Sequence, residues 1–156
     1  MITLPSLGDE VSVWMEATPA EVWGLVSDVT RIGEFSPETF EARWTRGATG
    51  PEVGAHFKGH VKRNGVGPTY WSGCRVTACE PEKVFEFSVG SDSITVNNWG
   101  YRLEPKDGGT LVTEYFRMEP SLPTRLYWTV LGGLRGRTNR RGMRTTLERM
   151  KAVVEK

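Results

Sequence analysis

The 156-residue sequence has no long hydrophobic run and almost no net charge. Its longest mostly apolar stretch, residues 126–134, is far too short to cross a bilayer as a helix. The formal net charge of +1 gives no overall field that would attract nucleic acid, so no nucleic-acid partner is expected. The first ten residues, MITLPSLGDE, contain neither the basic segment nor the apolar core of a signal peptide. We therefore expect a cytoplasmic protein.

Cysteine and histidine are scarce, with two of each. Cys74 and Cys79 fall at an odd offset within one expected strand, on opposite faces, so no disulfide between them is expected. His56 and His60 lie in another expected strand, where four residues span roughly 13 Å, too far to share a metal ion. No serine stands in a G-x-S-x-G context and no phosphate loop is present. The sequence thus predicts neither a metal site nor a cofactor.

A well-marked helix follows the first expected strand. Thr18 is in the N-cap position, Pro19 comes directly after it, and Glu21 stands three residues after the cap, which is the capping-box pattern. Apolar residues then recur at helical spacing, which predicts a short amphipathic helix. A second short helix is expected over 30–35, because the Ser-Pro pair at 36–37 ends it.

Strands dominate the rest of the chain up to Pro120. Turn signals such as PKDGG at 105–109 separate short alternating segments, which indicates an antiparallel meander. From 124 to 156 the pattern is helical, with a bend expected at the Gly pair 132–133. Seven strands are expected, at 10–17, 40–47, 55–63, 69–80, 83–90, 94–104 and 110–119. Such a sheet must curl around the long helix to bury its apolar face, and one helix leaves a tunnel.

A series of motifs runs along nearly the whole chain, in the order ATPAEVWGLVSDV, GEFSPE, GPEVGAHFKG, ACEPEKVFEF, WGYRLEPKDGGTLVTE and TLERMKAVVE. Their order resembles that of the START/polyketide-cyclase-like superfamily (SRPBCC), which has the helix-grip fold. The resemblance implies one α+β domain over 1–156 that is similar to small bacterial polyketide cyclase/dehydrase or lipid-transport-like proteins. It further implies binding of a hydrophobic small molecule (a lipid, polyketide or isoprenoid) between sheet and helix. The alternative is an aromatase/cyclase or dehydratase that uses the same cavity.

Aromatic and apolar side chains on the expected strands form the best candidate lining for a cavity. Polar groups among them would orient the ligand. Glu114 would face the cavity only if its face of strand 110–119 is concave, and it would then need Arg75 or Arg102 as a partner, or a raised pKa. The sequence leaves open which face that is. The candidate lining residues are Phe57, Trp71, Cys74, Val76, Phe85, Phe87, Asn97, Trp99, Tyr101, Glu114 and Phe116.

Two further hypotheses concern the ends of the molecule. The short helices would close one end of the curled sheet, with Val26, Ile32, Phe35 and Phe40 as a gate that controls ligand entry. Residues 124–156 carry nine basic and two acidic side chains, either as a solvated face or as a contact for an anionic membrane or an acidic partner. The arginines concerned are Arg137, Arg140, Arg141 and Arg144. Antiparallel edge strands also permit a homodimer.

Overall fold

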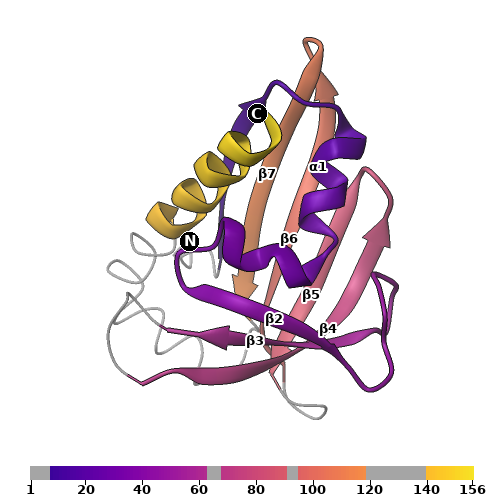
Figure 1. The fold of residues 1–156 in the computed structure, drawn as a ribbon, viewed down its shortest axis with the longest axis vertical. Helices are drawn as coiled ribbons and strands as arrows, with labels where there is room; N and C mark the ends of the chain where they lie inside the picture. Colours follow the sequence, from indigo (N-terminus) through magenta and orange to yellow (C-terminus); the bar gives the residue numbers. More distant parts are fainter. Residues whose placement is uncertain (1–7, 63–67, 91–94, 119–139) are drawn as a thin grey trace, which may run out of the picture.

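A seven-stranded antiparallel sheet, strongly curled, forms the body of the protein (Figure 1). The computed structural model describes residues 8–62, 68–90, 95–118 and 140–156. Along the sheet the strand order is β1-β7-β6-β5-β4-β3-β2, so the first strand pairs with the last and the others form a meander. The α+β fold expected from the sequence is confirmed. The strands are β1 (Gly8–Met15), β2 (Thr39–Thr45), β3 (His56–Val61), β4 (Tyr70–Glu80), β5 (Val84–Gly90), β6 (Thr95–Lys106) and β7 (Gly109–Met118).

The helix α1 (Pro19–Val26) begins where its capping signals predict. The Thr18 hydroxyl accepts a hydrogen bond from the Glu21 N–H and donates to the Glu21 carboxylate, both at 3.1 Å. This pairing satisfies one of the N–H groups that a helix leaves without an internal partner. The second short helix, η1 (Val29–Glu34), is a 3₁₀ helix. The Asp28 side chain caps its N-terminus by accepting a hydrogen bond from the Thr30 N–H.

Turn chemistry sets the β6–β7 hairpin. Asp107 and Gly108 connect the strands, with φ angles of 49° and 77°. Positive φ at both positions is the mark of a type I′ turn, whose twist matches that of the flanking strands. The hairpin is therefore tighter than the five-residue turn expected at 105–109, and Pro105 belongs to β6.

A bulge in β4 corrects one expectation about the cysteines. The β4–β5 register shifts between Val76 and Ala78, so Cys74 pairs with Val89 and Cys79 pairs with Phe85. The extra residue reverses the inward–outward alternation beyond it, and the two cysteines lie on the same face rather than on opposite faces. Both are free thiols.

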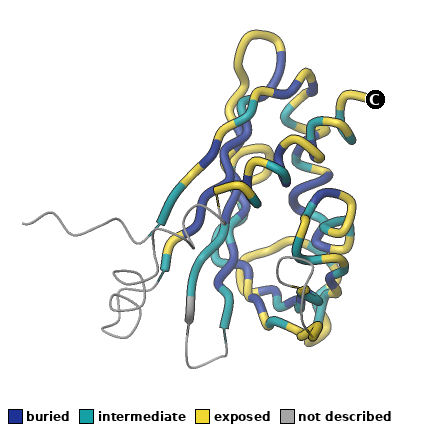
Figure 2. The backbone as a smooth tube through the Cα atoms, turned by 90° about the vertical axis from the view of Figure 1, so that its left-hand side faces the viewer, coloured by how far each residue is buried: buried dark blue, intermediate teal, exposed yellow. Residues whose placement is uncertain are grey.

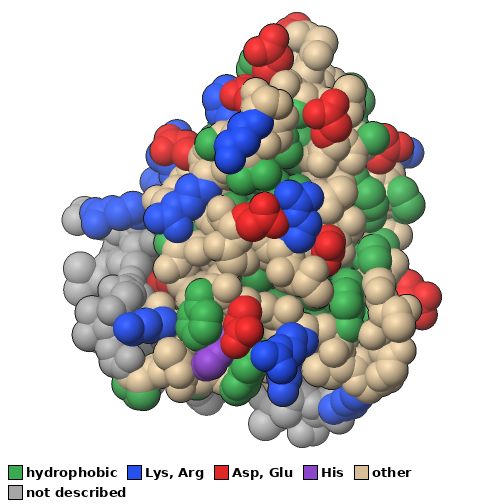
Figure 3. Space-filling model, viewed as in Figure 1, with side chains coloured by type: hydrophobic (Ala, Val, Ile, Leu, Met, Phe, Trp, Pro, Cys, Tyr) green, Lys and Arg blue, Asp and Glu red, His purple; other side chains and the backbone are tan. Residues whose placement is uncertain are grey.

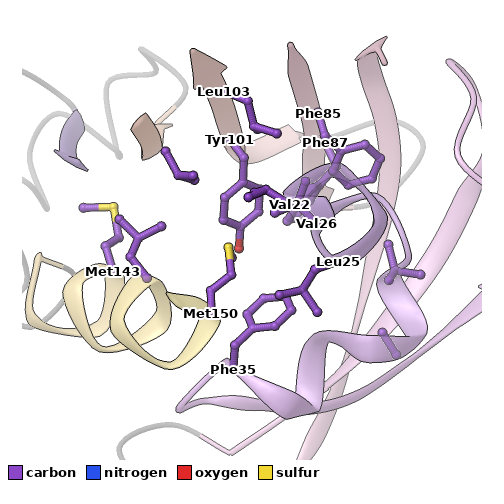
Figure 4. Close-up of a cluster of buried hydrophobic side chains, with 14 of the residues drawn as sticks. Val22, Leu25, Val26, Phe35, Phe85, Phe87, Tyr101, Leu103, Met143 and Met150 are labelled. Carbon is purple, nitrogen blue, oxygen red and sulfur yellow. The ribbon is translucent and has the colours of Figure 1, made fainter. Parts of the chain in front are cut away.

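One face of the curled sheet carries the core. Both α1 and the C-terminal helix, described over 140–154, lie against this concave face, and η1 lies with them toward β2 (Figures 1 and 2). Met143, Leu147 and Met150 follow helical spacing and are completely or almost completely buried. They meet residues of α1 and of β5–β6 in the cluster of Figure 4. The helical expectation for 124–139, including the bend at 132–133, lies outside the described residues.

Candidate functional site

The candidate site is the concave face of the sheet. Cross-strand register decides which side chains share it, because directly opposed residues point to the same side. Starting from buried Val11 of β1, the register leads through Glu114 and Tyr101 to Phe85. This settles the open question about β7, since Glu114 faces the concave side. Ten of the candidate residues lie there: Phe57, Cys74, Val76, Phe85, Phe87, Asn97, Trp99, Tyr101, Glu114 and Phe116.

Aromatic rings cover much of this face. The ring centroids of Phe57 and Phe87 are 5.1 Å apart, in an edge-to-face arrangement that joins β3 to β5. Those of Trp99 and Phe116 are 5.0 Å apart and join β6 to β7. Aromatic pairs in this range contribute about 0.5–1.5 kcal/mol beyond the area they bury. Trp99 itself is only half-buried, so part of this wall is accessible.

Glu114 is a carboxyl group placed in this apolar surface. The residue is 6% exposed, and the Tyr101 hydroxyl donates a hydrogen bond to its Oε1 at 3.5 Å. Among the described residues, the other oxygen, Oε2, is buried without a hydrogen-bond partner. Burial raises the pKa of Glu114 well above its ordinary value, and the Tyr101 hydrogen bond opposes this only in part. Burial therefore favours the protonated, neutral form of this carboxyl group.

The two arginines considered as partners of Glu114 lie elsewhere. Arg102 is on the outer face, where it binds Glu10 and lies 4.8 Å from the Tyr115 ring centroid. Arg75 is exposed on the face opposite Cys74. Neither arginine therefore forms an ion pair with Glu114. A buried polar group without its hydrogen bond costs about 1–3 kcal/mol, which makes the free Oε2 a notable feature.

Two more polar groups lie on the concave face. Asn97 stands four residues before Tyr101 on β6, and its buried Oδ1 has no hydrogen-bond partner in the part of the chain that the structure describes. The Cys74 thiol donates weakly to the Ser72 carbonyl oxygen at 3.6 Å. Burial raises the pKa of this thiol to about 12, so it stays protonated and is not a nucleophile. The face therefore offers hydrogen bonding in an apolar setting.

With this geometry in place, comparison with known proteins identifies the family. Residues 10–155 match the family described as "Polyketide cyclase / dehydrase and lipid transport". The chain belongs to this family. The match spans every described strand and helix except the first residues of β1, so the resemblance stated from the sequence is confirmed.

Solved structures agree with the fold of this polyketide cyclase/dehydrase family member. The Polyketide_cyc-like protein Cgl2372 from Corynebacterium glutamicum is 28% identical, with a TM-score of 0.60 over 97% of this chain and 93% of that one. Protein SA2116 from Staphylococcus aureus has a TM-score of 0.70 at 13% identity, over 95% and 93% of the chains. Protein Ms6760 from Mycobacterium smegmatis has a TM-score of 0.67 at 16% identity, over 98% and 94%. The last two show the fold alone. No curated protein matches the chain.

Trp71 was expected in the lining, and that expectation is wrong. It pairs with His60 on the outer face, where the two rings stack with centroids 4.3 Å apart and an interplanar angle of 16°. The Lys58 ammonium lies 4.5 Å from the indole centroid, and Trp71 is 40% exposed. An odd offset from Cys74 places its side chain on the opposite side of β4. The Trp71 ring therefore contacts the Lys58 ammonium and the His60 imidazole on the outer face and does not pack in the core.

The candidate gate residues divide into two groups. Val26 and Phe35 are 3% and 2% exposed and pack in the core cluster of Figure 4, while Ile32 is half-buried. Phe40 is 46% exposed, and its ring lies 4.3 Å from that of His60 on the outer face. A register shift between Thr39 and Glu41 turns β2 at this point. Phe40 is therefore not placed with the other three.

His60 lies in a mixed patch of the outer surface. Its Nδ1 donates a hydrogen bond to Glu41 at 2.9 Å, and this bond is the main reason that the pKa of Glu41 is lowered. The space-filling view shows a histidine among charged and hydrophobic side chains over β2 and β3 (Figure 3). Within the described residues, no group of three or more His, Cys, Asp or Glu side chains could hold a metal ion.

Two aromatic residues outside the candidate lining and gate also belong with the site. Trp44 on β2 makes an edge-to-face contact with Phe57 at a centroid distance of 5.7 Å. Trp23 on α1 does the same with Phe85 at 6.2 Å. Alternation along β2 could have identified Trp44, because it lies two residues from buried Ala42. Trp23 follows from α1 lying on the concave face, which the helical pattern alone does not state.

The basic C-terminal helix is partly engaged within the chain. Arg140 binds Asp9 of β1 through two guanidinium nitrogens, at 2.8 and 2.5 Å. Arg141 and Arg144 are exposed, and Arg137 lies outside the described residues. The contact with a membrane or an acidic partner stays a prediction. None of the helices described here is long and apolar enough to span a membrane.

A separate cleft of about 470 Å³ lies along the β2–β3 connection and is lined by residues 46–56. Its side chains include Arg46, Glu52 and His56, with Arg46 donating toward the His56 ring at 3.4 Å. Backbone and charged groups form most of its wall. It lacks the aromatic surface of the concave face, so we place the candidate site on the latter.

Proposed function

We propose that the protein binds a neutral, hydrophobic small molecule between the concave face and the C-terminal helix, and that it acts as a carrier or binding module. The observation that carries the proposal is an aromatic wall that contains buried polar atoms without partners, on Glu114 and Asn97. Such a mixture is typical of pockets for drug-sized ligands. Membership of a family described by both cyclase and lipid-transport members supports the same class of ligand.

Binding ranks above catalysis because the described part of the concave face has a sparse set of groups for proton transfer. Its one carboxylic acid with a raised pKa is Glu114, and its partner Tyr101 has a pKa raised even above the ordinary phenol value. Both shifts favour the protonated form, which cannot act as a general base. A cyclase or dehydratase that uses Glu114 as a general acid is the second candidate, favoured by that same protonated carboxyl.

The test of binding uses N-phenyl-1-naphthylamine, a neutral probe whose fluorescence rises in apolar surroundings. We expect micromolar binding to the wild type and about tenfold weaker binding to Trp99→Ala, because the ring that stacks on the ligand is lost. Trp14→Ala is the matched control, since Trp14 is an exposed residue on the outer face. Native mass spectrometry of protein purified without detergent should also show a bound apolar molecule.

Absence of binding by the wild type would contradict the proposal, as would equal losses in the two tryptophan variants. Catalysis is tested separately with a linear poly-β-ketone thioester. If the wild type turns this substrate over and Glu114→Gln does not, a cyclase or dehydratase becomes the favoured function. We expect no turnover.

A further inference from the structure

The orphan polar atoms on the concave face restrict the chemistry of the occupant, an argument that rests on the proposed binding function. Register aligns three successive rows of side chains across β6 and β7. The first row pairs Asn97 with Met118, the second Trp99 with Phe116, and the third Tyr101 with Glu114. Unpartnered Asn97 Oδ1 and Glu114 Oε2 therefore stand at the two ends, with the aromatic pair between them.

The distance between the two ends follows from strand geometry. Asn97 and Tyr101 are four residues apart on β6, and a strand rises about 3.3 Å per residue, so the end rows are roughly 13 Å apart. A molecule that reaches both must be elongated. The rings of Trp99 and Phe116 between them favour a flat ring system, because stacked or tilted rings gain contact area without losing conformational freedom.

The Glu114 end presents a hydrogen-bond donor. Tyr101 donates to Oε1, so in the protonated form of Glu114 the proton belongs on Oε2, which has no acceptor among the described residues. On the neighbouring strand β1, the Asp9 carboxylate is paired with Arg140. Figure 4 shows the Tyr101 hydroxyl directed from β6 toward the C-terminal helix, on the side of Met150. Met150 is unbranched and flexible, which lets this end adapt to a ligand.

The Asn97 end presents an acceptor. Its buried Oδ1 lacks a donor, so a hydroxyl or N–H group on the occupant would satisfy it. Met118, directly opposite on β7, supplies no donor that could do so. The two ends are therefore chemically different and define a direction for the ligand.

We propose that the site selects an elongated, uncharged aromatic molecule with a carbonyl oxygen at the Glu114 end and a hydroxyl group at the Asn97 end. A hydroxylated aryl ketone is the simplest member of this class. Carboxylates and phosphates are disfavoured, because the described lining offers a neutral acid where an anion would need a cation.

The test compares three naphthalenes of nearly the same shape, followed by fluorescence titration. They are 2-isopropylnaphthalene, 2-acetylnaphthalene and 6-hydroxy-2-acetylnaphthalene, which carry no oxygen, a carbonyl, and a carbonyl with a hydroxyl. We expect the wild type to bind each about tenfold more tightly than the one before, since each step satisfies a buried polar atom.

Variants assign each step to its residue. Glu114→Leu should remove the tenfold preference for the acetyl compound, whereas Glu114→Gln, which keeps an N–H donor, should retain most of it. Asn97→Leu should remove the hydroxyl preference alone. Glu104→Gln on the outer side of β6 is the matched control and should change neither step. Circular dichroism checks that each variant is folded, and the Gln variant preserves the side-chain shape.

The outcomes distinguish a failure of the ligand selectivity from a failure of the binding function. Equal affinity of the wild type for all three compounds would overturn the selectivity and leave the binding function intact. A tenfold preference that persists in Glu114→Leu would overturn the role of Glu114. Failure of the wild type to bind any of these compounds or N-phenyl-1-naphthylamine would overturn both.

Discussion

At the scale of the residue, Glu114 links binding chemistry to stability. Burial raises the pKa of its carboxyl well above the ordinary value in the folded protein, whereas the unfolded chain exposes the group to water. The folded state thus holds a proton that the unfolded state releases. Stability must then fall as pH rises, which is the reverse of the behaviour of a carboxylate in an ion pair.

This pH dependence is measurable by urea unfolding between pH 4 and pH 7. Above the ordinary carboxyl pKa of 4.5, and up to the raised pKa of the folded state, Glu114 should lower the free energy of unfolding by about 1.4 kcal/mol per pH unit. In Glu114→Gln this contribution is absent, so the variant should gain stability relative to the wild type as pH rises. Parallel pH profiles for the two proteins would show that Glu114 is ionised when folded.

Residue type and strand alternation placed some side chains on the wrong face of the sheet, and the local backbone geometry explains why. Strand alternation correctly groups Trp99 and Tyr101 on one face, and the regular β6–β7 register then places Glu114 on the same face. Trp71 is aromatic yet faces outward, covered by His60 and Lys58. The cysteines share a face because β4 contains a bulge, and the sequence carries no clear signal for that extra residue.

At the scale of the element, close packing holds η1 against the beginning of β2. Gly33 of η1 has no room for a side chain, because a Cβ there would lie 2.2 Å from the backbone carbonyl oxygen of Phe40. Backbone atoms cannot move aside as a side-chain tip can. The 3₁₀ helix is held against the start of the strand by this contact.

Two glycine-to-alanine substitutions test that contact, one at the close approach and one at a glycine with free space around it. Gly33→Ala should lower the free energy of unfolding by about 1–3 kcal/mol, because it forces η1 away from β2. Gly24→Ala in α1 meets no atom within 4 Å and should raise it by about 0.5–1 kcal/mol through helix propensity. Chemical denaturation measures both. Stabilisation by Gly33→Ala would mean that the two elements are not in contact.

Element prediction succeeded where the signal was local. The Thr18 cap, the Pro stop after η1 and the Asp-Gly turn all depend on residues within a few positions of one another. The observed strand boundaries differ from the predicted ones by one or two residues. Strand β6 includes Pro105, because the end of a strand tolerates proline. The tightness of Gly33 against Phe40 depends on packing between elements and has no counterpart in local sequence.

At the scale of the whole molecule, the order of the strands divides the sheet into a centre and two edges. Strands β3, β4, β5, β6 and β7 have a partner on each side, with β5, β6 and β7 in or next to the middle of the order, while β1 and β2 are edges. The centre also carries Phe85, Tyr101 and Phe116, all nearly or fully buried. Local stability should therefore differ across the sheet, since buried, doubly paired strands open only with global unfolding.

Native-state hydrogen exchange tests this division. Amides of β6 and β7 should exchange with the free energy of global unfolding, and those of β2 should exchange by local opening about 2 kcal/mol lower or more. An apolar probe that occupies the concave face should raise protection in the centre. Equal protection of β2 and β7 would contradict a graded sheet.

The overall architecture was predictable because strand count, helix order and turns all point to one arrangement. Ten of eleven candidate lining residues share the concave face, which follows from the period of two along strands. The missing partners of Asn97 and Glu114 could not be predicted, since they depend on what side chains from other elements fail to reach.

The pairing of β1 with β7 has a consequence for how the chain is made. Met15 finds its partner Thr110 only after nearly the whole sheet has been synthesised. At roughly 5–20 residues per second, the ribosome takes about 5–20 s to supply that partner. During this interval, β1 keeps Val11 and Met15 unburied in the nascent chain. A chaperone that binds short apolar segments would therefore meet this protein first at β1 and release it when β7 emerges.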